Sequence, residues 1–559
     1  MSTKQSSKFP LKNQAITLIA MGVLAVFIGY ITYINFSYYW DFLHSDIVAD
    51  LAFIREAAGS FSLFPNGWAH INEMRFVYVT TVAIPFYWIT GNVHLAYSLA
   101  VSLMLMVNIA LFYYMVSFKK RNLLAVLVGV IVFLMFFSRY SIFSVFSILF
   151  INGTLSTHLA TVFLTLGVYL RIKYQTGTSF KWEKFLWVAT LILAFAQGIQ
   201  STRMIMALYG PLFVVEVLPI LLSGAKSKTT KVNGKSLLYI TAAFFLNVLG
   251  ILFINFLITN GTVVLEEASL TFGLNLVNTD QFIDRTLQSI TMLFNTFGLV
   301  GGIELLSTEG LMFILRTGFI FVTILIYCQI KKVASDQNLV NALATTVIFS
   351  VLSQALISIG MGERFNFTAT ALLAVMFVII LDHLLETVRQ GQFNETSFKD
   401  FLANELEYKD LQKPLVGGLI AIALLGSFLS MNHLGATRNP GLVADRQRVV
   451  DFLIEEELNV GYGAFWQGLA ITGVANWDVV VIPFHSNHGV VGQPLRQGVA
   501  YNDFFHTEER VFLVGTTSHM EEAYSHHRMG PFLQQGQRHD FSGGWVVYVF
   551  DFNPWAEFK

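Results

Sequence analysis

The sequence predicts an α-helical polytopic membrane protein with a small extracytoplasmic α/β domain near its C-terminal end. Of its 559 residues 54% are hydrophobic and 13% are charged, against about 25% charged residues in soluble proteins. Composition turns polar only after residue 433. Soluble cores cannot bury so much apolar surface, and a net charge of -1 excludes the basic field that attracts nucleic acid.

Eleven apolar runs are long enough to cross a membrane as helices. They are 14–36, 93–117, 122–138, 155–172, 184–200, 204–223, 236–259, 309–330, 339–360, 366–385 and 414–432. The first follows a tail with three lysines and has no small-residue cleavage site after it. We therefore interpret it as a retained helix and not as a cleaved signal peptide.

Two further apolar stretches, 76–90 and 287–304, are interrupted by proline or glycine. The positive-inside rule decides how they are placed. With the N-terminus in the cytoplasm, Lys119–Arg121 and Lys331–Lys332 are cytoplasmic only if neither stretch crosses. We expect both to lie along the outer face, buried by protein.

The predicted organisation is therefore a membrane domain over 1–433, with outer loops 37–92 and 260–308, and an extracytoplasmic domain over 434–559. The latter has helical patterns at 443–458 and 465–474. Its expected strands are the apolar runs at 478–484, 510–514 and 545–550.

The tail also holds seven histidines, and the spacing of six of them matches no metal-ligand motif. These six are His485, His488, His519, His526, His527 and His539. We interpret them as solvated or hydrogen-bonded side chains. No cofactor is predicted, and a divalent metal has no motif to support it.

The first outer loop carries Asp41, Asp46 and Asp50 in quick succession. Ser45 is placed to cap a helix that begins near Asp46, which puts Asp46 and Asp50 on one helix face. Two like charges so placed repel, unless one of them faces a cation or a site. The segment is expected to be amphipathic and to lie flat at the membrane surface. An acidic face there suits chemistry on a lipid head group, whereas acids that merely complement the helix dipole are the alternative.

Arginines recur at the outer ends of the predicted spans: Arg75, Arg203 and Arg364, with Arg316 about one and a half turns inside its span. Guanidinium groups match phosphate oxygens with two hydrogen bonds, so these residues suggest an anionic lipid head group as ligand. Anchoring of helix ends at the interface is the alternative for each. Glu216, deep in its span, is interpreted as a helix-packing contact.

Together these features resemble the GT-C class of membrane glycosyltransferases. The segment SDIVAD at 45–50 is similar to the acidic motif of that class's first loop, and GSFSLFPNGW at 59–68 to its continuation in bacterial members. GIQSTRMIMALYGPL at 198–212 and GERFNFTATALL from Gly362 resemble arginine-bearing helix starts, and YGAFWQGLAITGV at 462–474 resembles the tail domain. The metal-binding Asp-x-Asp and the Trp-Trp-Asp motifs of the eukaryotic oligosaccharyltransferases are absent.

The resemblance implies an integral membrane hexosyl- or pentosyltransferase that uses a polyprenyl-phosphate-linked sugar donor and a cell-envelope glycan or protein as acceptor. It implies Asp46 as catalytic carboxylate, with Asp50 or Glu73 assisting. Arg203 and Arg364 are then expected on the donor phosphate, with Arg75 and Arg316 as further substrate-binding candidates. A lipid-linked-sugar transporter and a non-catalytic envelope assembly protein remain the alternatives. A transporter should carry charges near the membrane midplane, which are sparse here.

Overall fold

The computed structural model describes residues 9–63, 65, 68–70, 74–138, 153–174, 181–223, 233–265, 280–298, 304–330, 337–356, 366–390, 408–436, 438–484, 510–518, 520–521 and 530–554. Its contacts divide the chain into two compact units. Unit 1 comprises 1–32, 103–253 and 272–437, and unit 2 comprises 33–102, 254–271 and 438–559. Each unit combines three segments that are distant in the sequence but in contact in the structure. The predicted domains instead divide the chain once, at residue 433, and that boundary stays a prediction.

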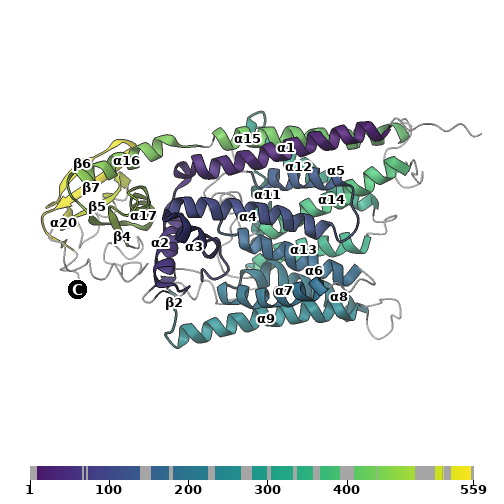
Figure 1. The fold of residues 1–559 in the computed structure, drawn as a ribbon, viewed down its shortest axis with the longest axis horizontal. Helices are drawn as coiled ribbons and strands as arrows, with labels where there is room; N and C mark the ends of the chain where they lie inside the picture. Colours follow the sequence, from purple (N-terminus) through teal and green to yellow (C-terminus); the bar gives the residue numbers. More distant parts are fainter. Residues whose placement is uncertain are drawn as a thin grey trace, which may run out of the picture. The chain divides into compact units, whose positions relative to one another are not determined.

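Every predicted span contains a helix (Figure 1). These helices are α1 (Phe9–Ser37), α4 (Val93–Val116), α5 (Leu123–Phe136), α6 (Ser156–Tyr174), α7 (Lys181–Gln200), α8 (Gly210–Ser223), α9 (Gly234–Thr259), α12 (Thr308–Ile330), α13 (Gln337–Leu356), α14 (Phe367–Gln390) and α15 (Tyr408–Ala436). Within the described ranges, six helices are long and apolar enough to cross a membrane. The chain is therefore a multi-pass membrane protein, while the count of eleven crossings is not confirmed.

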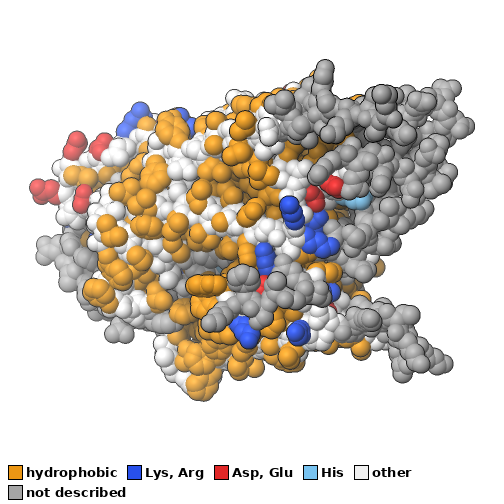
Figure 2. Space-filling view, turned by 45° about the vertical axis from the view of Figure 1, so that its right-hand side comes forward, with side chains coloured by type: hydrophobic (Ala, Val, Ile, Leu, Met, Phe, Trp, Pro, Cys, Tyr) orange, Lys and Arg blue, Asp and Glu red, His pale blue; other side chains and the backbone are white. Residues whose placement is uncertain are grey.

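The outer surface of these helices is apolar. Figure 2 shows hydrophobic side chains over much of the face it presents, with charged side chains gathered in a few places. On α9, for example, Phe245, Leu252 and Phe256 are each more than half exposed. Such a surface suits a hydrocarbon solvent, in which helices must satisfy their own backbone groups.

Helices of unit 1 pack closely where glycines face them. A Cβ built on Gly198 of α7 would lie 2.1 Å from the carbonyl oxygen of Asn247, and one on Gly250 would lie 2.2 Å from that of Phe195. The backbones of α7 and α9 therefore touch through a pair of small residues, as membrane helices commonly do.

The two stretches that were predicted not to cross form short helices. Helix α3 (Val79–Thr90) has 12 residues and a length of about 18 Å, against about 30 Å for the hydrocarbon core. Helix α11 (Phe282–Phe297) buries Ser289 and Thr296 and exposes Ile283 and Leu287. Neither is among the six candidate spans. These properties agree with the predicted lateral placement, which stays a prediction.

Unit 2 is built around a five-stranded mixed sheet of order β4-β3-β5-β7-β6. The strands are β3 (Val460–Ala464), β4 (Val480–Phe484), β5 (Val511–Thr516), β6 (Gln537–Asp540) and β7 (Trp545–Phe550). Strand β3 runs parallel to β4 and β5, and β7 runs antiparallel to β5 and β6. Helices α16 (Pro440–Glu455), α17 (Phe465–Val474) and the short α20 (Gly530–Leu533) accompany it.

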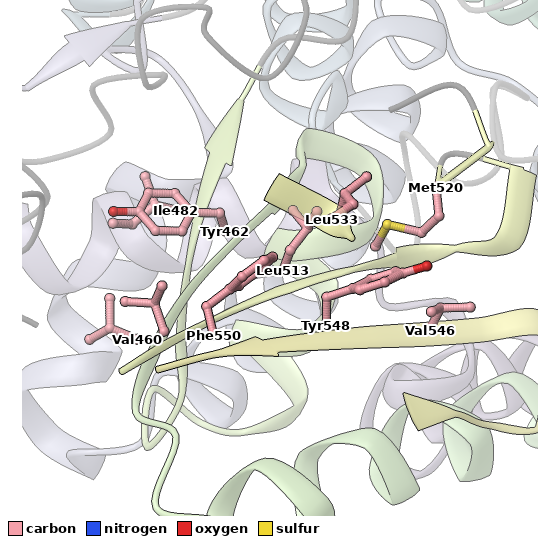
Figure 3. Packing of buried hydrophobic residues seen from close by; sticks show 10 residues of the cluster. Val460, Tyr462, Ile482, Leu513, Met520, Leu533, Val546, Tyr548 and Phe550 are labelled. Carbon is pink, nitrogen blue, oxygen red and sulfur yellow. The ribbon is translucent and has the colours of Figure 1, made fainter. Parts of the chain in front are cut away.

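Alternate residues of these strands supply one hydrophobic core, in which Tyr462, Leu513 and Tyr548 lie close together (Figure 3). The predicted small α/β domain is thus confirmed, including both helices and the three predicted strands. Strands β3 and β6 were not predicted.

The first outer loop completes unit 2. It holds the 3-10 helix η1 (Tyr39–Phe42), α2 (Ser45–Ser60), α3 and β1 (Ala69–His70). Strand β1 pairs in parallel with β2 (Val264–Leu265), which follows α9. The second outer loop therefore joins the first by a backbone ladder.

Candidate active site

Helix α2 carries the acidic motif, and it is buried along most of its length. Positions 47 through 54 are consecutively buried, and the helix packs against α3 and α17. Protein therefore covers successive sides of this helix, which differs from the one-sided apolar pattern of the expected amphipathic helix. Its placement flat at the membrane surface stays a prediction. Ser45 is the first helical residue and His44 occupies the N-cap position. The predicted Ser45 cap is wrong, since its buried hydroxyl makes no hydrogen bond with any described residue.

Asp50 lies in a buried ion pair. The Nε of Arg75 donates to its Oδ1 at 2.6 Å, and the hydroxyl of Tyr97 donates to its Oδ2 at 3.3 Å. Asp50 is 1% exposed and Arg75 8%. Two predicted site residues are thus brought together, and one of the two helix acids faces a cation, as the like-charge argument requires. A carboxylate held by a guanidinium and a phenol keeps its charge and its orientation.

Asp46 has a different environment one helical turn earlier. Its side chain is half-buried in the first turn of α2, where the positive end of the helix dipole favours a carboxylate. It makes no ion pair with another described residue. Of the two acids, Asp46 is therefore the one whose charge no described cation compensates through an ion pair. Glu73, the third predicted acid, lies outside the described residues.

His44 lies two residues before Asp46, at the N-cap position of α2. Burial lowers the pKa of His44, Asp46 opposes that shift, and Arg446 adds to it. A neutral imidazole is therefore favoured at neutral pH. The phenol of Tyr39 has a pKa raised well above its ordinary value by burial and by the charge of Asp50. It therefore stays protonated.

Arg316 of unit 1 is fully enclosed, at 1% exposure. Its guanidinium donates to the carbonyl oxygens of Met135 at 3.0 Å and Phe297 at 3.4 Å, and to the hydroxyl of Ser138 at 3.0 Å. Met135 and Phe297 lie at the C-terminal ends of α5 and α11, where carbonyls lack helical partners and the dipole is negative. The position of Arg316 inside its span suggested an interior partner. Two of the partners observed are carbonyl groups at the C-terminal ends of α5 and α11.

Arg203 follows the C-terminal end of α7 and precedes a π-helix, η3 (Ile205–Tyr209). Such turns occur often at functional sites. Arg203 is half-buried, and the fully buried His158 of α6 lies 3.3 Å from the side-chain amide of Gln200. A polar region with one cation thus lies between α6 and the end of α7. Arg364, its predicted partner, lies outside the described residues.

Glu216 of α8 is a packing contact, as predicted. It accepts hydrogen bonds from Tyr169 and, at 2.5 Å, from Lys173, both on α6. Among described residues there is no group of three or more histidine, cysteine, aspartate or glutamate side chains that could hold a metal ion. Of the seven tail histidines only His539 is among the described residues, and its ring lies 4.6 Å from that of Phe452.

Comparison with known proteins identifies solved structures that have a similar fold. No known protein-family model matches the chain, and no curated protein sequence matches it significantly. Among solved structures, ArnT from Cupriavidus metallidurans bound to undecaprenyl phosphate is similar, with a TM-score of 0.56, 13% identity, and coverage of 96% of this chain and 97% of that one. The apo form of the same ArnT is also similar, with a TM-score of 0.56, 12% identity, and coverage of 97% of this chain and 99% of that one. ArnT is a GT-C glycosyltransferase, so the predicted resemblance to that class is confirmed at the level of the fold.

Proposed function

We propose that this protein is an integral membrane glycosyltransferase that moves a sugar from a polyprenyl-phosphate donor to an extracytoplasmic cell-envelope acceptor. The observation that carries the proposal is the likeness to ArnT over almost the full length of both chains. One of those ArnT structures holds undecaprenyl phosphate, a lipid phosphate of the proposed kind. The environment of Asp46 supports the same proposal.

The proposed reaction is a displacement at the anomeric carbon. The acceptor hydroxyl oxygen attacks that carbon while the bond from the carbon to the phosphate oxygen breaks, and the polyprenyl phosphate leaves with the electron pair. Asp46 takes the hydroxyl proton as general base. Asp50 has its charge compensated by Arg75, so its part in this proposal is to keep α2 in place.

The phosphate of the donor requires cations, and Arg203 and Arg364 are the proposed ligands. A guanidinium stabilises the negative charge that grows on the leaving phosphate. Arg316 already donates to three protein oxygens, which supports a structural role for it more than a substrate contact. The proposed orientation has a cytoplasmic N-terminus and an extracytoplasmic tail, because phosphate-linked donors replace nucleotide sugars outside the cell.

Turnover in liposomes tests the proposal. The full-length protein is reconstituted with a panel of labelled polyprenyl-phosphate sugars and an envelope extract as acceptor. Asp46→Asn keeps size and removes the base, so we expect kcat to fall at least about a hundredfold while donor binding survives. The matched control is Asp284→Asn, an exposed acid in the first turn of α11, which should retain full turnover.

The alternatives give different outcomes in the same assay. If Asp46→Asn keeps full turnover and Glu73→Gln loses it, the base is Glu73. Movement of labelled donor across the bilayer without sugar transfer would support a transporter instead. No turnover with any donor and any acceptor fraction would contradict the proposal.

The arginine part of the proposal has its own test. Loss of a charge-assisted hydrogen bond to phosphate should cost about 1.5–3 kcal/mol. We therefore expect Arg203→Ala and Arg364→Ala each to raise donor KM or lower kcat about ten- to a hundredfold, with Arg448→Ala of the tail unchanged. Normal kinetics in both variants would leave the donor phosphate without its proposed ligands.

A further inference from the structure

The tail reaches the segment that leads into Asp46. Arg446, on α16, is 8% exposed, and its Nη1 donates to the carbonyl oxygen of Leu43 at 2.6 Å. Leu43 follows η1 and lies three residues before Asp46. Burial of a charged guanidinium costs free energy unless its donors are hydrogen-bonded. The charge-assisted hydrogen bond from Arg446 therefore restrains the backbone at Leu43.

A second arginine of the tail holds the other end of this segment. The Nε of Arg438 donates to Oδ2 of Asp41 at 2.7 Å, and its guanidinium lies 3.3 Å from the ring centroid of Tyr38. The ion pair acts on Asp41 within η1, and the cation–π contact acts on Tyr38, the residue that precedes η1. The two tail arginines thus contact the segment before Asp46 at two positions, Asp41 and Leu43.

The helix that carries Asp46 is held as well. A Cβ built on Gly473 of α17 would lie 2.4 Å from a methyl carbon of Val48, so the side chain of Val48 packs directly against the backbone of α17 at this glycine. Trp477, beyond α17, has a left-handed φ of 70°. Its ring carries the guanidinium of Arg55 at 4.5 Å and faces His94 at 6.0 Å. Strained non-glycine backbone of this kind persists only where surroundings fix it.

We infer that the C-terminal domain positions the catalytic carboxylate: Arg446 and Arg438 are positioning residues that hold residues 41–46, and α17 holds α2 behind them. The inference rests on the proposed function, since it names what the tail does for that site. The tail then contributes to the rate of the chemical step and not to the affinity for the lipid donor. Small displacements of a reacting group are enough for large losses of rate.

Hydrogen exchange tests the contact without any assay of activity. In Arg446→Ala the amides of residues 41–50 should exchange about tenfold faster or more, while peptides from β5 and β7 keep their protection. Arg446→Lys keeps a charged donor and should restore most of the protection. Arg448→Ala, on the same helix and with a side chain 61% exposed, should match the wild type. Unchanged exchange at 41–50 in both Arg446→Ala and Arg438→Ala would overturn the inference.

Kinetics of the same variants separate positioning from mere stability. We expect Arg446→Ala to lower kcat about ten- to a hundredfold with donor KM unchanged, and Arg446→Lys to recover most of the rate. Combined with Asp46→Asn, the arginine change should lower kcat no further, because it acts through that carboxylate. A further, multiplicative fall in the double variant, or a rise in donor KM alone, would refute positioning.

The outcomes distinguish this inference from the proposed function. If the wild type transfers no sugar, the proposed function fails first. If the wild type is active, Asp46→Asn is inactive and Arg446→Ala retains its kcat, only the inference fails. Should Arg446→Ala lose the protection of β5 and β7, Arg438→Ala replaces it in both measurements, with the same expected faster exchange at residues 41–50 and the same fall in kcat.

Discussion

Asp50 and Arg75 were both predicted as site residues, and the structure joins them to each other inside protein. Removal of one partner of a buried pair leaves the other charge uncompensated, at a cost of about 3–5 kcal/mol. We therefore expect Arg75→Ala to lower the apparent free energy of unfolding by about this amount, measured by thermal unfolding in nanodiscs. Replacing both residues by apolar ones should cost less than Arg75→Ala alone.

An exposed pair provides the control for that measurement. Arg510 and Glu456 lie 3.0 Å apart with side chains 45% exposed, and exposed pairs contribute about 0–1 kcal/mol. Glu456→Ala should therefore change stability little. Equal losses in Arg75→Ala and Glu456→Ala would contradict the buried-pair argument.

His44 predicts a pH dependence of stability. Its folded pKa lies below the ordinary value of 6.5 because burial disfavours the charged ring. The folded state therefore binds fewer protons than the unfolded state between these two pKa values. Stability should be unaffected above about pH 6.5 and fall as the pH drops from there toward the lowered folded pKa. The wild type should lose more unfolding free energy than His44→Phe between pH 7.5 and pH 5, and equal losses would contradict this reading.

At the residue scale the sequence predicted types of partner but not their identity. A cation inside a span, Arg316, indicated an interior partner, yet two of the three acceptors described above are backbone carbonyls, those of Met135 and Phe297. Backbone acceptors have no signature in a sequence. Arg438 and Arg446 were missed for a related reason, since nothing in an amphipathic helix pattern distinguishes a buried arginine from a solvated one.

Helices α3 and α11 are the elements on which the topology depends. Because neither is long enough to be a candidate span, α4 should return the chain to the cytoplasm ahead of Lys120. We expect Lys120→Cys, in a Cys328→Ser background, to react with an impermeant thiol reagent only from the cytoplasmic side. Ser62→Cys in the first outer loop is the control and should react only from outside. Labelling of residue 120 from outside the cell would contradict the predicted membrane topology.

The tail shows which elements a sequence can reveal. Helix α17 was predicted at its observed bounds, and β7 likewise, because each has a strong apolar pattern between clear ends. Strand β3 was missed because it contains Gly461 and Gly463, which weaken strand propensity. The structure requires them: a Cβ at Gly461 would lie 2.5 Å from the Phe512 ring. Strand β6 was missed because its residues are polar and mostly exposed at the sheet edge.

At the scale of the whole molecule, composition was enough to predict a membrane protein, and layout was enough to predict a GT-C-like fold. The assembly of unit 2 could not be predicted. Its three segments are separated in the sequence by long stretches of unit 1. A single sequence does not show which distant segments are in contact in the folded protein. The contacts of the tail with Asp41, Leu43, Val48 and Arg55 are therefore visible only in the structure.

That separation along the chain sets a schedule for biosynthesis. Residue 46 leaves the ribosome 400 residues before residue 446, which is about 20–80 s at the usual elongation rate of roughly 5–20 residues per second. Throughout that interval α2 has been made and α17, which packs against it, has not. The apolar side chains of α2 that α17 covers in the folded protein are therefore without that cover during this interval. A chain that ends after α16 would contain α2 but lack the helix α17 that packs against it.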